Sequence, residues 1–195
     1  LAVLISGRGS NMLAIARACA EGHVPARIVS EIADRADAPG IQAAASAGLS
    51  TQVLEARGLP RAQFEARLAQ TLTACGAQLV ALAGFMRILS AAFVAPWAGR
   101  MLNIHPSLLP AFPGANAYRQ AYERGVKVVG VTAHFVTPNL DEGPIIAQEV
   151  LRVRSNEPLA RIVKRGQSLE TKCMLAAIRT YVTKRLDVHW GRVYS

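Results

Sequence analysis

Short segments rich in apolar and β-branched residues alternate with helical segments through the first half of the chain. The strand-like segments are 1–5, 27–32, 51–54 and 78–83, and the helical ones are 12–20, 36–47 and 60–74. Strands buried on both faces read as continuous apolar runs, and strands that alternate with helices need crossover connections. The first half therefore predicts a parallel sheet covered by helices on both faces.

The second half continues this pattern and then changes it. A strand is expected at 101–105 and a helix at 117–124, while 126–136 and 144–153 read as two strands around a turn. A long helix follows at 158–184, and Gly166 interrupts it at a cost of roughly 1 kcal/mol relative to alanine, for which a ligand contact would be one reason. The expected fold is α/β, with a single doubly wound, mostly parallel sheet and an antiparallel addition in the C-terminal half.

Length and composition favour one domain and exclude several classes of protein. A chain of 195 residues with 51% apolar residues fits a single domain over 1–195. No apolar run approaches the ~20 residues of a bilayer span. The net charge of +9 comes from scattered arginines and aromatic residues make up only 6%, which favours small anionic ligands over nucleic acid.

The cysteines indicate a reducing compartment. Cys19, Cys75 and Cys173 are odd in number and widely spaced, and they show no zinc-ligand spacing. The opening Leu-Ala-Val-Leu-Ile lacks the features of a signal peptide. We therefore expect a cytoplasmic protein without a metal, whose partners are small molecules rather than a membrane or nucleic acid. Monomer and homodimer remain open.

A glycine loop, Ser-Gly-Arg-Gly-Ser-Asn at 6–11, lies between the first strand and the first helix. Glycines let the backbone approach a ligand closely, and the N–H groups at a helix start form an anion site. A phosphate-binding loop at Gly9, Ser10 and Asn11 is predicted, and a side chain at Gly9 would intrude on the anion or forbid a positive φ. The alternative is an ordinary tight turn.

Candidate catalytic groups follow the strand at 101–105. Asn103 and His105 are two residues apart, so both side chains point from one face of a strand, and the prolines at 106 and 110 stiffen the loop that follows. Asp141 lies in a Pro-Asn-Leu-Asp-Glu-Gly turn and is a candidate partner for the imidazole, because a nearby carboxylate orients a histidine. Taken alone, these residues also fit a satisfied strand edge and an Asx-turn.

The segments around these residues, LNIHPSLLPAFPG and AHFVTPNLDEGPII, resemble the folate-dependent formyltransferase family, and the resemblance extends from Leu1 to about residue 180. SGRGSN and AGFMRILS (83–90) are similar to the members that formylate glycinamide ribonucleotide. Residues 121–150 are instead similar to the formyltetrahydrofolate deformylases. The resemblance implies the formyltransferase fold.

By this resemblance, a formyl group passes from 10-formyltetrahydrofolate to the amine of glycinamide ribonucleotide in purine synthesis. Asn103 and a protonated His105 would stabilise the oxyanion, and Asp141 would keep the imidazole charged and move the proton. One alternative is hydrolysis of 10-formyltetrahydrofolate by the same three residues, with water as nucleophile. Another is a non-catalytic folate or nucleotide binding module.

The resemblance also implies two sets of binding residues. The ribonucleotide would contact Gly9, Ser10, Asn11, Gln167 and Glu170. The folate would contact Arg61, Met86, Arg87, Ile88, Leu89, Val94, Asn103, Val136, Thr137, Pro138, Asn139, Leu140 and Asp141. Without the resemblance, the apolar side chains of 86–94 would be interpreted as core packing.

Overall fold

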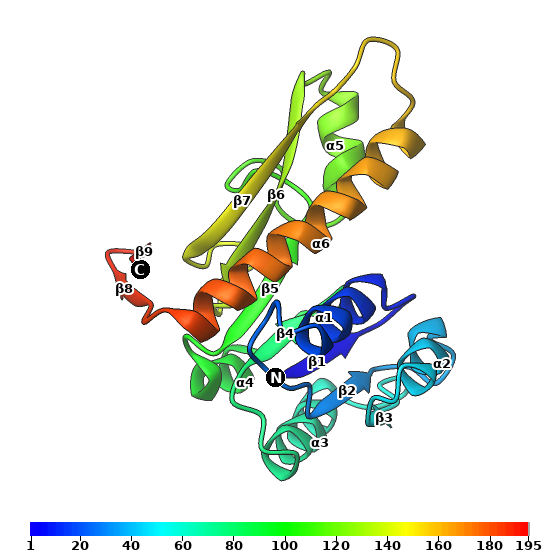
Figure 1. The fold of residues 1–195 in the computed structure, drawn as a ribbon, viewed down its shortest axis with the longest axis vertical. Helices are drawn as coiled ribbons and strands as arrows, with labels where there is room; N and C mark the ends of the chain where they lie inside the picture. Colours follow the sequence, from blue (N-terminus) through cyan, green and yellow to red (C-terminus); the bar gives the residue numbers. More distant parts are fainter. Residues whose placement is uncertain (195) are drawn as a thin grey trace. The chain divides into compact units, whose positions relative to one another are not determined.

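The computed structural model describes residues 1–194. Its contacts group into two compact units, an N-terminal unit Leu1–Leu102 and a C-terminal unit that begins at Asn103. Seven strands follow the order β3-β2-β1-β4-β5-β6-β7, and β5, Met101–His105, belongs to both units (Figure 1). The predicted α/β fold with a mostly parallel sheet is confirmed, and the single domain over 1–195 remains a prediction.

The N-terminal unit is a parallel sheet with helical crossovers. Strand β1, Ala2–Ile5, pairs with β2 on one side and β4 on the other, in the register Leu4↔Ile32 and Leu4↔Leu82. All residues of β1, β2 and β4 are buried, as expected of strands covered on both faces. The other elements are β2 Ser30–Ala33, β3 Thr51–Val53, β4 Val80–Leu82, α1 Ser10–Ala20, α2 Pro39–Ser46, α3 Arg61–Ala74, α4 Ala91–Val94 and η1 Ala95–Trp97.

The C-terminal unit is built on an antiparallel pair and one long helix. Strands β6, Val128–Phe135, and β7, Ile145–Arg152, pair antiparallel. Helix α6, Leu159–Thr183, runs along both strands and also packs against α5, Ala117–Glu123 (Figure 1). The buried side chains of α6 recur at helical spacing and include Ile162, Met174, Ala177 and Ile178.

The structure differs from the sequence prediction mainly at the C-terminus. A hairpin of β8, Asp187–His189, and β9, Arg192–Tyr194, lies in a segment without a recognisable pattern. Both turn residues, Trp190 and Gly191, have positive φ (52° and 70°), the backbone that a two-residue hairpin turn needs. Tryptophan is rare at a positive φ, so the sequence lacks the Asn-Gly or Asp-Gly pair that would predict this hairpin.

The cysteines and the long helix can now be placed in the fold. Cys173 is buried, and burial raises the pKa of its thiol to about 11, whereas Cys19 and Cys75 are half-buried. Helix α6 continues without a break through Gly166. Within residues 1–194, no helix combines the length and the apolar character needed to cross a membrane.

Strand β2 of the N-terminal unit carries a buried carboxyl group, that of Glu31. Glu31 on β2 is fully buried, and neither of its oxygens has a hydrogen-bond partner in the described chain. Burial raises the pKa of Glu31 from 4.5 to about 7. Between these pH values the folded protein holds a proton that the unfolded chain has released, so the free energy of unfolding falls as the pH rises.

Glu31→Gln is expected to remove this pH dependence, because the amide stays neutral at every pH. The wild-type free energy of unfolding should fall by no more than about 3 kcal/mol between pH 4.5 and 8 from this group. Denaturant unfolding at a series of pH values measures it, with the exposed Glu123→Gln as control. An unchanged slope in Glu31→Gln would contradict the assignment.

Candidate functional site

Strand β5 carries two candidate residues at its carboxyl end. Asn103 is half-buried and His105 is buried. Ile104 points the other way and is buried as well, which is the alternation expected of a strand. The strand register thus places an amide and an imidazole on one face.

Asp141 meets His105 in the C-terminal unit. One of its oxygens, Oδ2, lies 3.3 Å from His105 Nδ1 and accepts a 2.8 Å hydrogen bond from the Gly114 N–H. Asp141 has φ 56°, a left-handed backbone that aspartate tolerates better than most residues. Its side chain is only 5% exposed. The turn therefore delivers a nearly buried carboxylate to the imidazole.

Both nitrogens of His105 face oxygen acceptors. Nε2 lies 2.9 Å from the Phe112 carbonyl oxygen, and Nδ1 faces the Asp141 carboxylate. A carbonyl and a carboxylate can only accept, so the doubly protonated ring satisfies both contacts. The two contacts together fix the orientation of the imidazole ring.

A second histidine, His134 on β6, completes the cluster and was not singled out from the sequence. Its Nε2 lies 3.3 Å from the Asn103 amide nitrogen and 3.9 Å from Asp141 Oδ1. Its Nδ1 lies 2.9 Å from the Phe135 carbonyl oxygen, so Nδ1 carries the proton and Nε2 accepts from Asn103. Burial lowers the pKa of His134, which keeps this neutral form. The sequence did contain a signal for His134, because a histidine within an otherwise apolar strand needs a polar partner.

A bulge fixes the position of His134. The β6–β7 register shifts between Ala133 and His134, and bulges of this kind often lie beside functional sites. Gly143 packs against the carbonyl that His134 contacts, because a Cβ at Gly143 would lie 1.7 Å from the Phe135 oxygen. Glycine is required there by close backbone approach.

A polar network attaches the loop after His105 to the antiparallel pair. The buried Thr132 hydroxyl donates to the Ser107 carbonyl (2.7 Å) and accepts from the Leu109 N–H (3.1 Å). The Gln148 amide donates to Thr132 Oγ1 (2.9 Å) and to the Leu109 carbonyl (3.1 Å). These four bonds hold the loop that carries the His105 acceptor.

The two predicted ribonucleotide contacts in this unit lie on α6. Glu170 Oε1 accepts a 2.9 Å hydrogen bond from the Tyr118 hydroxyl, and Gln167 is half-buried. The same tyrosine explains Gly166, since a Cβ there would lie 2.1 Å from the Tyr118 oxygen. A ligand contact was one possible reason for this glycine, and a contact within the protein now accounts for it.

The glycine loop lies in the N-terminal unit, between β1 and α1. Gly9 has φ 71° and precedes Ser10, the first residue of α1, which is exposed. A Cβ at Gly9 would lie 2.9 Å from Met12 Cε and 3.2 Å from Gly40 Cα, whereas a Cβ at Gly7 would meet nothing within 4 Å. The positive φ expected at Gly9 is confirmed, and the protein itself also occupies the space that a side chain would need. The phosphate contact of this loop stays a prediction.

The segment after β4 contains both exposed and buried members of the predicted folate set. Met86 and Ile88 are 82% and 64% exposed, while Leu89 and Val94 belong to the core. Exposure of two large apolar side chains in one loop argues against core packing for them. Core packing does describe Leu89 and Val94.

Hydrogen bonds fix both ends of this loop. The Met86 N–H donates to Ser6 Oγ at 2.9 Å, which connects it to the glycine loop. At the other end, Glu65 accepts from the Ser90 N–H at 2.7 Å. The Arg87 guanidinium lies over the Phe64 ring, 5.1 Å from its centroid, so the loop is held although its apolar side chains are exposed.

The remaining predicted folate residues are exposed or half-buried. Arg61 is the first residue of α3 and is exposed. In the turn before Asp141, Leu140 is 52% exposed, and the Thr137 hydroxyl donates to the Asn139 carbonyl (3.1 Å). The other members of this turn are Val136 and Pro138.

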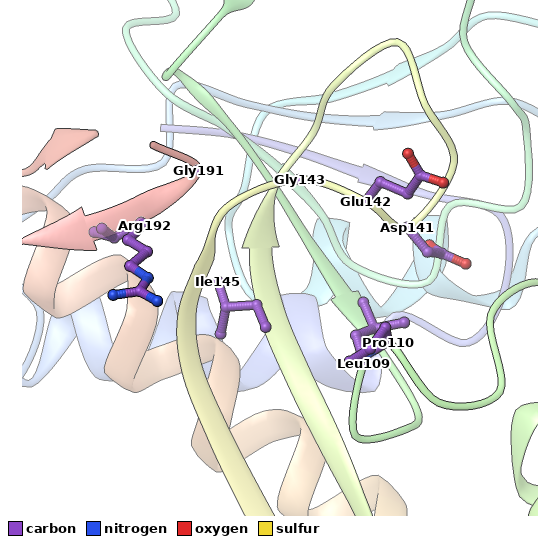
Figure 2. A pocket seen from close by; sticks show the side chains of 9 residues that line it. Leu109, Pro110, Asp141, Glu142, Gly143, Ile145, Gly191 and Arg192 are labelled. Atoms are coloured by element: carbon purple, nitrogen blue, oxygen red, sulfur yellow. The ribbon is translucent and has the colours of Figure 1, made fainter. Parts of the chain in front are cut away.

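A cavity of about 670 Å³ lies beside Asp141. Figure 2 shows Arg192 of the C-terminal hairpin on one side and the carboxylates of Asp141 and Glu142 on the other, with Ile145 between them. Pockets of this size accept small organic ligands. The sequence analysis did not predict the C-terminal hairpin, so it did not predict that Gly191, Arg192 and Val193 line this cavity. Residues 1–194 contain no group of three or more His, Cys, Asp or Glu side chains placed to hold a metal ion.

The fold and the amide–imidazole–carboxylate cluster define a protein of the formyltransferase class. The sequence profile of the formyl transferase family matches residues 1–178, which is most of the chain. The chain belongs to the formyl transferase family.

Named relatives include phosphoribosylglycinamide formyltransferase of Escherichia coli, which is 40% identical over 190 residues, covering 97% of this chain and 90% of the relative. The crystal structure of glycinamide ribonucleotide transformylase 1 from Symbiobacterium toebii has a TM-score of 0.95 at 44% identity, covering 98% of this chain and 91% of that one. The chain also spans 18% of the human trifunctional purine biosynthetic protein adenosine-3, at 42% identity over 180 residues and 92% of this chain.

The deformylase branch is also represented among the similar structures. Formyltetrahydrofolate deformylase from Burkholderia mallei has a TM-score of 0.90 at 33% identity, covering 98% of this chain and 68% of that one. The family is therefore shown by sequence and structure together, and the two branches share its fold.

Gly9→Ala is expected to lower the free energy of unfolding by about 1–2 kcal/mol, because alanine disfavours positive φ and its Cβ would crowd Gly40. Gly7→Ala is the matched control and should change stability by less than about 0.5 kcal/mol. Denaturant unfolding of both variants makes the comparison. Equal stability of the two would show that the contact with Gly40 does not constrain the loop.

Proposed function

We propose that the protein transfers the formyl group of 10-formyltetrahydrofolate to the amine of glycinamide ribonucleotide. The observation that carries the proposal is the contact of Asp141 with His105, beside an Asn103 amide that His134 orients. Membership of the formyl transferase family and the relatives named for this activity support the choice of substrates.

The reaction needs no covalent intermediate with the protein. The amine nitrogen attacks the formyl carbon, a new N–C bond forms, and negative charge develops on the formyl oxygen. The bond from this carbon to N10 of the folate then breaks, and a proton passes from the amine to N10. Preorganised donors at the formyl oxygen lower the barrier to this sequence.

Asn103 is the hydrogen-bond donor that this proposal directs at the formyl oxygen. One N–H of its amide is directed to His134 Nε2, which fixes the rotation of the group and leaves the second N–H for the formyl oxygen. His134 is thus a positioning residue in this proposal. Its neutral form is required, because an imidazolium would repel the amide hydrogens.

His105 supplies positive charge and a second donor. The formyl oxygen would compete with the Phe112 carbonyl for the N–H at Nε2, since that bond is 2.9 Å long here. Asp141 keeps the imidazole charged from the other side and accepts the proton of the amine, directly or through a water.

The binding residues follow the family resemblance. We assign the substrate phosphate to the loop of Gly9, Ser10 and Asn11, and the ribose or glycinamide part to Gln167 and Glu170. The folate is assigned to Arg61, to 86–89 and to the turn 136–141, where exposed Met86 and Ile88 offer apolar contact. The proposal places the enzyme in the cytoplasm, which suits its free cysteines.

Hydrolysis of 10-formyltetrahydrofolate is the second candidate. The similarity to formyltetrahydrofolate deformylases favours it, and water could replace the amine at the same three residues. The glycine loop argues for the transferase, because a hydrolase has no phosphorylated second substrate to hold at a helix start.

Formyl release from 10-formyltetrahydrofolate, followed with and without glycinamide ribonucleotide, separates the two candidates. Release is expected to be fast only when the ribonucleotide is present, and formylated ribonucleotide should accumulate in equal amount. Fast release that ignores the ribonucleotide would replace the transferase with the hydrolase.

Asp141→Asn is expected to lower kcat by about 10²–10³ with small changes in both KM values, because the carboxylate acts on the charged transition state. The amide can still accept from the Gly114 N–H, so the turn should survive. Glu123→Gln alters an exposed acid on α5, outside the proposed site, and serves as the control. Similar losses in both variants would remove Asp141 from the mechanism.

A further inference from the structure

Tyr118 and Glu170 form a hydrogen-bonded pair between α5 and α6. The phenol donates to Glu170 Oε1 at 2.9 Å, and Tyr118 is only 8% exposed. A hydrogen bond to a charged acceptor contributes more than one between neutral groups, and burial shields it from water. The contact therefore restricts where the Glu170 carboxylate can lie.

Gly166 makes this contact possible. It lies one turn before Glu170 on α6, so the two positions share one face of the helix. A Cβ at Gly166 would lie 2.1 Å from the Tyr118 oxygen and 2.3 Å from its Cζ atom. The tyrosine thus crosses the helix over a position without a side chain and reaches the next turn.

The donor is permanent at physiological pH. Burial is the largest cause that raises the pKa of Tyr118, and the charge and hydrogen bond of Glu170 add to it. The phenol therefore stays protonated and never changes roles with the carboxylate. A glycine inside a helix is less stable than alanine, and this contact offsets the loss.

We propose that Tyr118 is a positioning residue that fixes the Glu170 carboxylate for the ribonucleotide, with Gly166 as the gap that admits it. The inference rests on the proposed function, which assigns Glu170 to that substrate. Tyr118 itself touches no substrate in this proposal. Its effect is carried entirely by the carboxylate, so it should appear in ribonucleotide binding and leave the folate untouched.

Tyr118→Phe keeps the ring over Gly166 and removes only the donor. The ribonucleotide KM should rise about tenfold, with kcat within about twofold and the folate KM unchanged. Gly166→Ala should raise the same KM with the tyrosine still present, because the methyl group displaces the phenol. Tyr122→Phe, an exposed tyrosine of α5, is the matched control and should change nothing.

A double-mutant cycle with Glu170→Gln tests the route of the effect. If Tyr118 acts through Glu170, the double variant should bind the ribonucleotide no worse than Glu170→Gln alone. Independent, additive losses would overturn the inference, as would an equal rise of both KM values accompanied by lower stability, which would show a structural role only.

The failure of this inference differs from the failure of the proposed function. A raised ribonucleotide KM in Glu170→Gln with no effect of Tyr118→Phe would reject the positioning role while Glu170 keeps its assignment. No effect of Glu170→Gln would reject both. Formyl release that ignores the ribonucleotide in the wild-type enzyme would reject the proposed function itself.

Discussion

The Asp141 carboxylate connects three segments of the C-terminal unit. It accepts the Gly114 N–H from the loop after β5, faces the imidazole at the end of that strand, and lies near His134 of β6. A nearly buried carboxylate needs such partners, because an unpaired charge away from water is costly. The same requirement fixes the imidazole orientations, so the electrostatics of one side chain organise the whole cluster.

The surrounding polar groups are satisfied by the protein itself, which makes the cluster rigid before any ligand arrives. Thr132 and Gln148 hold the loop after His105, and Gly143 allows the close approach that positions the Phe135 carbonyl. Groups held in this way stabilise developing charge without reorganisation during the reaction. The cost is a site that depends on backbone contacts as much as on its three recognisable side chains.

In the N-terminal unit, close backbone packing and a hydrogen bond hold the loops in place. Gly9 and Gly40 pack too closely for a side chain, and the Ser6 hydroxyl links the glycine loop to the exposed loop at Met86. The two segments assigned to different substrates are therefore joined by one hydrogen bond. A displacement of either loop would therefore break or shift this hydrogen bond and move the other loop.

The sequence by itself determined the strand–helix alternation, the strand at Met101–His105 and the antiparallel pair, because periodicity and turn chemistry are local properties. Strand spacing and turn composition made Asn103, His105 and Asp141 candidates, and the family resemblance gave them their expected roles. Only the tertiary structure decided the partners. His134, the Phe112 carbonyl and Tyr118 meet their contacts across gaps of seven to fifty-two residues, and no local pattern encodes such distances. The hairpin at the C-terminus was hidden for a related reason: its turn relies on a positive φ at Trp190, which is imposed by strand pairing against the preference of the residue.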